Sequence, residues 1–164
     1  PRPRLDPTSP AMSQIAELLP AGNILLDLDA GSKTRLIEAV GALFEANRGL
    51  SRKTVVDSLL AREKLGSTGL GQGVAIPHGR IRGLAQAQGA FVRLKSPIPF
   101  DAPDGKPVAH VFVLLVPEQA TEKHLQLLSE LAQMFSETRF REGLAEPADA
   151  AGVHAKFERW APAA

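Results

Sequence analysis

The 164-residue sequence contains no cysteine, no tyrosine and a single tryptophan. Without cysteine the chain can form neither disulfides nor thiol nucleophiles, which fits a reducing compartment. No apolar run approaches the roughly 18 residues that a membrane-spanning helix needs. Residues 1–10 carry basic side chains without a following apolar region, so we expect no signal peptide. The sequence therefore predicts a cytoplasmic protein without membrane insertion.

The chain also lacks an excess of charge of either sign. Lys and Arg number 19 against 18 Asp and Glu, which gives a formal net charge of +1. Nucleic-acid-binding domains usually show a clear basic excess, so we expect no nucleic-acid partner. A chain of this length buries about 68–70% of its unfolded surface, which is enough for one core. We expect a single domain over residues 14–164, after a disordered, proline-rich leader over residues 1–13.

Hydrophobic spacing predicts strands that alternate with helices. Residues 108–116 form an almost unbroken apolar run, rich in β-branched side chains, which indicates a central strand. Residues 90–95 alternate apolar and polar side chains, as in a half-buried strand, and residues 96–106 are expected to form a connection. Further strands are predicted at residues 24–28 and 74–76. This alternation predicts an α/β fold: a single-domain mixed β-sheet with helices packed on both faces.

Capping residues and apolar faces predict where the helices lie. Ser32 and Ser51 are suited to cap the N-termini of two consecutive helices. A third helix carries His124 one turn before Leu128, and we expect this histidine to point inward near the helix start. A last helix is expected after Pro147.

The stretch from Arg62 to Arg80 combines turn residues with one histidine, and it has glycine at positions 66, 69, 71 and 73. Each glycine would cost a helix about 1 kcal/mol relative to alanine, so this backbone is expected to bend closely around something. Pro77 fixes its own φ and favours extended backbone at the preceding residue. We expect this rigid backbone to fix the direction of the His78 side chain. Gly79 has no Cβ, and we expect it to let an incoming group approach the imidazole and leave neighbouring N–H donors accessible.

The chemistry of this stretch can be narrowed by elimination. A metal site would need further ligands, and the segment has no cysteine, no second histidine and only Glu63 as a carboxylate. A phosphate loop of the Walker type would need Lys and Ser or Thr where Gln72 and Gly73 stand. What is left is nucleophilic catalysis by a neutral imidazole. A phosphoryl group is the expected transferred group, with Arg62 and Arg80 as candidate charge partners.

Structural explanations for the same residues stay open at this point. His78 could be a loop histidine held by hydrogen bonds, and residues 66–73 could be an ordinary Ω-loop. His124 could be a histidine satisfied at a helix start. His110, which opens a buried strand, and His154, on the last helix, are expected to be structural.

Several separated motifs resemble the IIA domain of the bacterial phosphotransferase system, of the mannitol/fructose class, and look most like its nitrogen-regulatory branch. They are Arg62-Glu63, Gly66-Ser67-Thr68-Gly69, Ala75-Ile76-Pro77-His78-Gly79, Pro97-Ile98-Pro99-Phe100-Asp101, the Leu-Leu-Val-Pro ending at Pro117, and His124-Leu125-Gln126-Leu127-Leu128. The resemblance implies that His78 is phosphorylated and that His124 lies beside it. With it we expect Arg62, Thr68 and Gly79 to stabilise the phosphoryl group, without a metal, nucleotide or other cofactor.

The resemblance also implies partners. A phosphohistidine carrier protein would donate the phosphoryl group, and either regulatory protein targets or a IIB domain would respond to it. Because no fused IIB, IIC or carrier-protein segment accompanies the domain, we expect a nitrogen-related regulatory module. The alternatives are a sugar-transport IIA component that passes phosphoryl to a IIB partner, and a ligand-sensing domain that has lost the chemistry.

Overall fold

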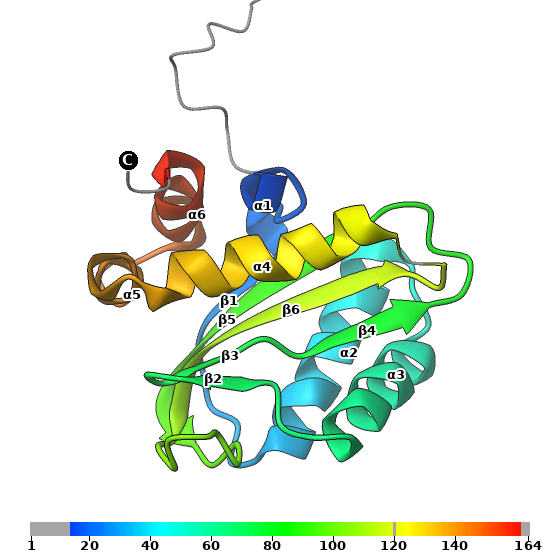
Figure 1. Ribbon diagram of the computed structural model, residues 1–164, viewed down its shortest axis with the longest axis horizontal. Helices are drawn as coiled ribbons and strands as arrows, with labels where there is room; N and C mark the ends of the chain where they lie inside the picture. The colour runs from blue at the N-terminus through cyan, green and yellow to red at the C-terminus, as the bar shows by residue number, and fades with distance from the viewer. Residues whose placement is uncertain (1–13, 120, 162–164) are drawn as a thin grey trace, which may run out of the picture.

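The computed structural model describes residues 14–119 and 121–161, so the expected leader at residues 1–13 lies outside the described residues. The chain folds into one six-stranded mixed sheet with helices on both faces (Figure 1). The strands are β1 (Ile24–Leu28), β2 (Gly69–Gly71), β3 (Val74–Ala75), β4 (His78–Ile81), β5 (Gln88–Ile98) and β6 (Val108–Pro117). The helices are α1 (Gln14–Glu17), the 3₁₀ turn η1 (Ala21–Asn23), α2 (Lys33–Arg48), α3 (Arg52–Lys64), α4 (Glu122–Ser136), α5 (Thr138–Leu144) and α6 (Ala150–Arg159).

The central strand is β6, as the sequence predicts. It pairs antiparallel with β5 on one side, and β5 pairs in turn with β1 in parallel. On its other side β6 pairs in parallel with β3 and then β4, with Ala75 opposite Val111 and His78 opposite Leu114. Pro77 lies between the two short strands, and its carbonyl accepts a hydrogen bond from the Leu114 amide at 3.0 Å. The strand predicted at residues 74–76 is confirmed as β3, which ends at Ala75, and after a break at residues 76–77 β4 begins at His78.

Each face of the sheet carries its own hydrophobic core. Helices α2 and α3 cover one face, where Phe44 and Leu59 are fully buried. Helices α1, α4, α5 and α6 cover the other face, where Leu131 and Phe157 are fully buried (Figure 1). The α/β fold class predicted from the alternation of elements is therefore confirmed.

The predicted caps of α2 and α3 are also confirmed. The Ser32 hydroxyl accepts a hydrogen bond from the Arg35 amide at 3.2 Å, and the Ser51 hydroxyl accepts one from the Thr54 amide at 3.3 Å. Helix α3 then runs for 13 residues and carries Arg62 in its last turn. Arg62 thus comes from a rigid element that packs against the sheet.

Strand β5 and the helices after α4 differ in detail from the sequence predictions. The first part of β5, residues 89–92, is buried on both faces rather than one, because Phe91 packs on Phe157 with ring centroids 5.4 Å apart. It also extends through Ile98 into the stretch predicted as a connection. Helix α5 was not predicted, since its seven residues bury only Phe140 and Leu144 and give too short a periodic pattern.

The glycine-rich segment forms a hairpin rather than an Ω-loop. Strands β2 and β3 pair antiparallel, and Gly71 lies opposite Val74. The two residues between them, Gln72 and Gly73, have φ of 59° and 78°. Positive φ at both central positions is the signature of a tight two-residue hairpin turn, which explains why glycine is found here.

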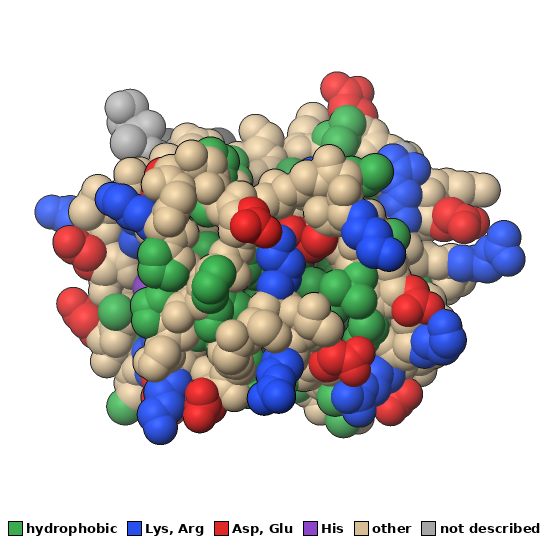
Figure 2. All heavy atoms as spheres, turned by 90° about the horizontal axis from the view of Figure 1, so that it is seen from below, with side chains coloured by type: hydrophobic (Ala, Val, Ile, Leu, Met, Phe, Trp, Pro, Cys, Tyr) green, Lys and Arg blue, Asp and Glu red, His purple; other side chains and the backbone are tan. Residues whose placement is uncertain are grey.

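The face seen from below in Figure 1 carries mixed charge. Figure 2 shows Lys and Arg side chains interspersed with Asp and Glu, and hydrophobic side chains between them. No single-sign patch dominates this face, in agreement with the formal net charge of +1. Among the described residues, no helix is long and apolar enough to cross a bilayer.

Candidate functional site

His78 lies in the wall of a cavity of about 410 Å³ between α3, β4 and the start of α4. The cavity brings together His78, His124, Arg62 and Gly79, four of the five residues that the sequence analysis assigned to the site. Its other lining residues are Ser58, Ala61, Leu65, Arg80, Leu114, Val116, Leu125 and Leu128. Leu65 and Leu125 are 84% and 63% exposed, so the histidines are flanked by apolar side chains open to solvent.

The tautomer of His78 follows from a single hydrogen bond. Its Nδ1 lies 2.8 Å from the carbonyl oxygen of Ile76. Because a carbonyl oxygen can only accept, Nδ1 carries the proton in the neutral ring and Nε2 keeps its lone pair. Burial lowers the pKa of His78 below its ordinary value, and the positive charge of Arg62 acts in the same direction. Both effects favour a neutral imidazole, in which Nε2 is the nitrogen with the free lone pair.

His124 has the opposite tautomer, because it takes part in the cap of α4. Its Nδ1 lies 3.0 Å from the backbone amide of Thr121, the N-cap residue, and accepts a hydrogen bond from it. In the neutral ring the proton is then on Nε2. The half-buried His124 lines the same cavity as His78 and can offer an N–H donor there.

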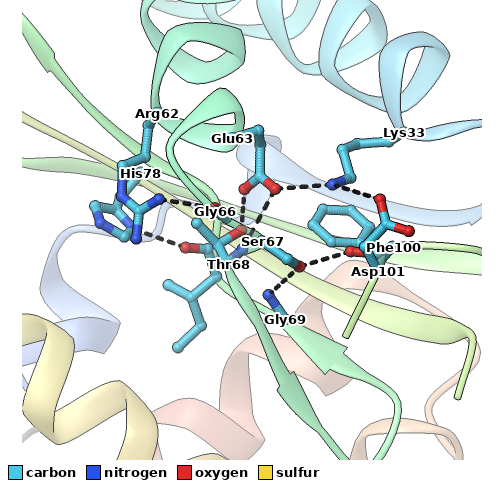
Figure 3. A network of polar contacts seen from close by, with 11 residues as sticks. Lys33, Arg62, Glu63, Gly66, Ser67, Thr68, Gly69, His78, Phe100 and Asp101 are labelled. Carbon is cyan, nitrogen blue, oxygen red and sulfur yellow. Dashed lines mark hydrogen bonds and ion pairs between the residues drawn. The ribbon is translucent and has the colours of Figure 1, made fainter. Parts of the chain in front are cut away.

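Two arginines supply positive charge near His78. Arg62 donates a hydrogen bond from Nη1 to the carbonyl of Gly66 at 2.8 Å, which fixes the guanidinium at the cavity (Figure 3). Arg80 also lines the cavity and donates from Nη1 to the carbonyl of Glu118 at 3.3 Å. Both cations can attract an anionic group to the imidazole.

Thr68 has a different environment from the one expected. Its side chain is buried, and its hydroxyl donates to the carboxylate of Glu63. The described residues that line the cavity do not include Thr68. Glu63 was not predicted from the sequence as the partner of Thr68. The adjacent Arg62 and Glu63 at the end of α3 could have indicated it, because the Arg62 side chain reaches the cavity and the Glu63 side chain reaches Thr68 (Figure 3).

Gly79 is required by packing rather than by access to the imidazole. A Cβ on Gly79 would lie 3.2 Å from the Cβ of Ser58 and closer still to its hydroxyl oxygen. The missing side chain therefore points toward α3, and β4 can pack closely against that helix. The expectation that this glycine opens a path to His78 is corrected accordingly, although its backbone still lines the cavity.

We predict that Gly79→Ala destabilises the protein by about 1–3 kcal/mol, because the added methyl group overpacks the contact with Ser58. Urea unfolding would measure this loss. Gly31→Ala is the matched control, since a Cβ there would meet nothing within 4 Å. The double variant with Ser58→Ala should recover part of the loss, and strictly additive effects would contradict the packing explanation.

The two remaining histidines lie outside this cavity. His110 stacks on Phe91 with ring centroids 5.9 Å apart, and burial lowers its pKa. His154 lies 3.2 Å from Glu158 and 3.3 Å from the carbonyl of Ala16. Within residues 14–119 and 121–161, no three His, Cys, Asp or Glu side chains are grouped to hold a metal ion.

Comparison with known proteins identifies the family. The profile described as "Phosphoenolpyruvate-dependent sugar phosphotransferase system, EIIA 2" matches residues 17–159. The crystal structure of nitrogen regulatory protein IIA-Ntr from Neisseria meningitidis is 55% identical, with a TM-score of 0.84 over 88% of this chain and 99% of that one. A nitrogen regulatory protein of Pseudomonas aeruginosa is 42% identical over 134 residues, 81% of this chain and 87% of its own length.

A more distant structure shares the fold alone. It is the complex of enzyme IIA and phosphorylated enzyme IIB for mannitol from Escherichia coli, which is 22% identical, with a TM-score of 0.70 over 85% of this chain and 98% of that one. The family profile covers every residue that lines the cavity between α3, β4 and α4. The chain belongs to the EIIA type 2 family of the phosphoenolpyruvate-dependent sugar phosphotransferase system.

Proposed function

We propose that this chain is a phosphocarrier that accepts a phosphoryl group on Nε2 of His78 and acts as a nitrogen-related regulatory module. The observation that carries the proposal is the 2.8 Å contact between Nδ1 of His78 and the Ile76 carbonyl, which leaves Nε2 unprotonated at the cavity. The similarity to nitrogen regulatory proteins, 55% and 42% identical, supports the regulatory role.

The transfer needs no proton movement on the attacking nitrogen. The lone pair of Nε2 forms the new P–N bond while the P–N bond to the donor histidine breaks, and the donor ring recovers its lone pair. The proton stays on Nδ1 throughout, in its hydrogen bond to the Ile76 carbonyl. Such transfers depend on positioning and charge stabilisation rather than on covalent help from the protein. We expect side chains and backbone of the chain to supply both, without a nucleotide or metal.

Two groups would stabilise the phosphoryl oxygens. The Nε2–H of His124 is a neutral donor, and the guanidinium of Arg62 is a charged one that lines the same cavity. The N-terminus of the 15-residue helix α4, next to His124, adds a favourable dipole for an anion. Gly79 would contribute backbone to the same wall, whereas Thr68 would act indirectly, through the amide of Ile76 that its carbonyl accepts from.

A phosphohistidine carrier protein is the proposed donor, and regulatory proteins or a IIB domain are the proposed receivers. The second candidate function, sugar transport through IIB, is favoured by the mannitol complex, in which a protein of this fold binds phosphorylated IIB. A phosphoryl group adds about −1.5 to −2 of charge near neutral pH by analogy with other phospho-residues, so a partner that contacts the cavity rim would distinguish the two forms. Cytoplasmic localisation stays a prediction of the sequence.

The test is to incubate the purified chain with phosphoenolpyruvate, the first enzyme of the system and its carrier protein, and to measure intact mass. We expect one phosphoryl group. Partners recovered with both forms should then differ in affinity by more than about tenfold. If the phosphorylated chain instead transfers its group to a IIB domain and a sugar becomes phosphorylated, the transport function replaces the regulatory one.

We predict that His78 stays neutral down to pH values below its ordinary pKa of about 6.5. Burial lowers its pKa, so protonation and loss of nucleophilicity should begin at lower pH than in the unfolded chain. Between the two pKa values the unfolded state binds more protons, so this group stabilises the fold above about pH 6.5 and the stability is lost as pH falls. Titration of the His78 ring by NMR, with the urea-unfolded chain as reference, would measure the shift. A pKa above the unfolded value would contradict the prediction.

A further inference from the structure

Glu63 is an unusual carboxylate, because its side chain is only 5% exposed and lies one residue from Arg62. Three donors converge on it: the ammonium group of Lys33 at 3.0 Å, the amide of Thr68 at 3.3 Å and the hydroxyl of Thr68. A carboxylate accepts hydrogen bonds at both oxygens, so these donors satisfy it in its charged form. The proposed phosphoryl transfer assigns no role to this buried charge.

Lys33 connects Glu63 to the Pro-Ile-Pro-Phe-Asp motif, whose purpose the sequence left open. Its ammonium group lies 4.5 Å from the centroid of the Phe100 ring and 3.9 Å from the carboxylate of Asp101. The carbonyl of Phe100 accepts a hydrogen bond from the Ser67 hydroxyl at 2.6 Å. The motif therefore holds Ser67, the residue next to Thr68, and Lys33, the cation that pairs with Glu63 (Figure 3).

From Thr68 the contacts lead to His78 through two backbone hydrogen bonds. The carbonyl of Thr68 accepts from the amide of Ile76 at 3.0 Å. The carbonyl of Ile76 in turn accepts from Nδ1 of His78 at 2.8 Å. Ile76 is thus held by Thr68 on its amide side and orients the imidazole on its carbonyl side.

We propose that Glu63, neutralised by Lys33, is a positioning residue for His78: it holds Thr68, Thr68 holds Ile76, and Ile76 fixes the ring with its proton on Nδ1. The expected effect on the rate of phosphoryl transfer rests on the proposed function. The expected effect on the tautomer of His78 does not, because the tautomer is a property of the unmodified chain. Glu63 does not line the cavity. Against the larger effect of burial, its charge raises the pKa of His78, and its effect on the position of the ring runs through the backbone of residues 68 and 76.

Glu63→Gln is the direct test. Glutamine keeps the shape, but its amide nitrogen cannot accept a hydrogen bond from Thr68 or Lys33. The matched control is Asp57→Asn, which removes the same charge from the same helix at an exposed pair with Lys53. Misplacement of a reacting group by about 1 Å can cost about 100-fold in rate, so we expect transfer to Glu63→Gln to slow by about 10- to 100-fold and Asp57→Asn to match the unaltered chain.

The decisive readout is the state of the ring, measured from the two ¹⁵N chemical shifts of His78 in unphosphorylated protein. We expect the proton on Nδ1 in the unaltered chain and in Asp57→Asn, and a larger share on Nε2 in Glu63→Gln. A merely structural role for Glu63 would lower the melting temperature without changing this ratio. Equal ratios and equal transfer rates in Glu63→Gln and Asp57→Asn would overturn the proposal.

A second pair of variants keeps the test decisive if Glu63→Gln does not fold. Thr68→Val removes the hydroxyl bonded to Glu63, and Thr68→Ser restores it. We expect Thr68→Val to show altered ¹⁵N shifts of His78 and slower transfer. Thr68→Ser should return both toward the values of the unaltered chain. Identical ¹⁵N shifts in the two variants would overturn the proposal. If the unaltered chain accepts no phosphoryl group at all, the proposed function fails, and the nitrogen shifts still decide the role of Glu63.

Discussion

His78→Ala is expected to accept no phosphoryl group from the phosphorylated carrier protein. In the unaltered chain Nε2 of His78 is the unprotonated nitrogen at the cavity, because Nδ1 is committed to the Ile76 carbonyl. His124 cannot substitute for it while its Nδ1 accepts from the Thr121 amide, which leaves the proton on Nε2. Removal of a nucleophile leaves no covalent intermediate, so the expected effect is complete loss. Intact mass under non-acidic conditions would measure it.

His154→Ala provides the matched control for this experiment. It removes another histidine of the chain, one that contacts Glu158 and the carbonyl of Ala16 outside the cavity. We expect this variant to gain one phosphoryl group as the unaltered chain does. A mass gain in His78→Ala that maps to another residue would remove His78 from the acceptor role.

Local sequence was sufficient to predict much of the fold. Ser32 and Ser51 cap their helices through contacts three residues away, and the apolar run at residues 108–116 has the composition of a strand buried on both faces. Such features depend on near neighbours or on composition, so they can be read without the fold. The burial of Phe91 depends instead on Phe157, 66 residues away, and the alternation within residues 90–95 concealed it.

The sequence predicted four of the side chains and backbone groups that line the cavity, but not the contacts that hold them in place. His78 is marked by Pro77 and the surrounding glycines, and His124 by the family motif. The partner of Glu63 is Lys33, 30 residues earlier, and nothing in the local pattern of either residue indicates the pairing. Gly79 shows the same limit, because its requirement comes from Ser58 across the contact between α3 and β4. The tautomers of the two histidines also depend on distances that only a folded chain defines.

Loss of the His124 imidazole should slow phosphoryl transfer without abolishing it. His124→Ala removes the Nε2–H donor proposed to stabilise the phosphoryl oxygens, and loss of one such donor costs about 10²–10³ in rate. The same variant also removes the bond that caps α4, since Nδ1 of His124 accepts from the Thr121 amide. A slower rate alone would therefore not separate the donor from the helix cap.

His124→Gln separates the two roles, because glutamine at the third helical position can accept from the N-cap amide of Thr121, as it does in a Ser/Thr-x-x-Gln capping box. We expect His124→Gln to keep the thermal stability of the unaltered chain and His124→Ala to lose some of it. Both should transfer phosphoryl slowly, because in both the imidazole N–H is gone while the nucleophile on His78 is intact. Single-turnover rates with phosphorylated carrier protein, measured beside melting temperatures, would show this pattern. If His124→Gln instead transfers at the unaltered rate, the imidazole N–H of His124 is not required, and the cap of α4 or the amide N–H of glutamine is sufficient in its place.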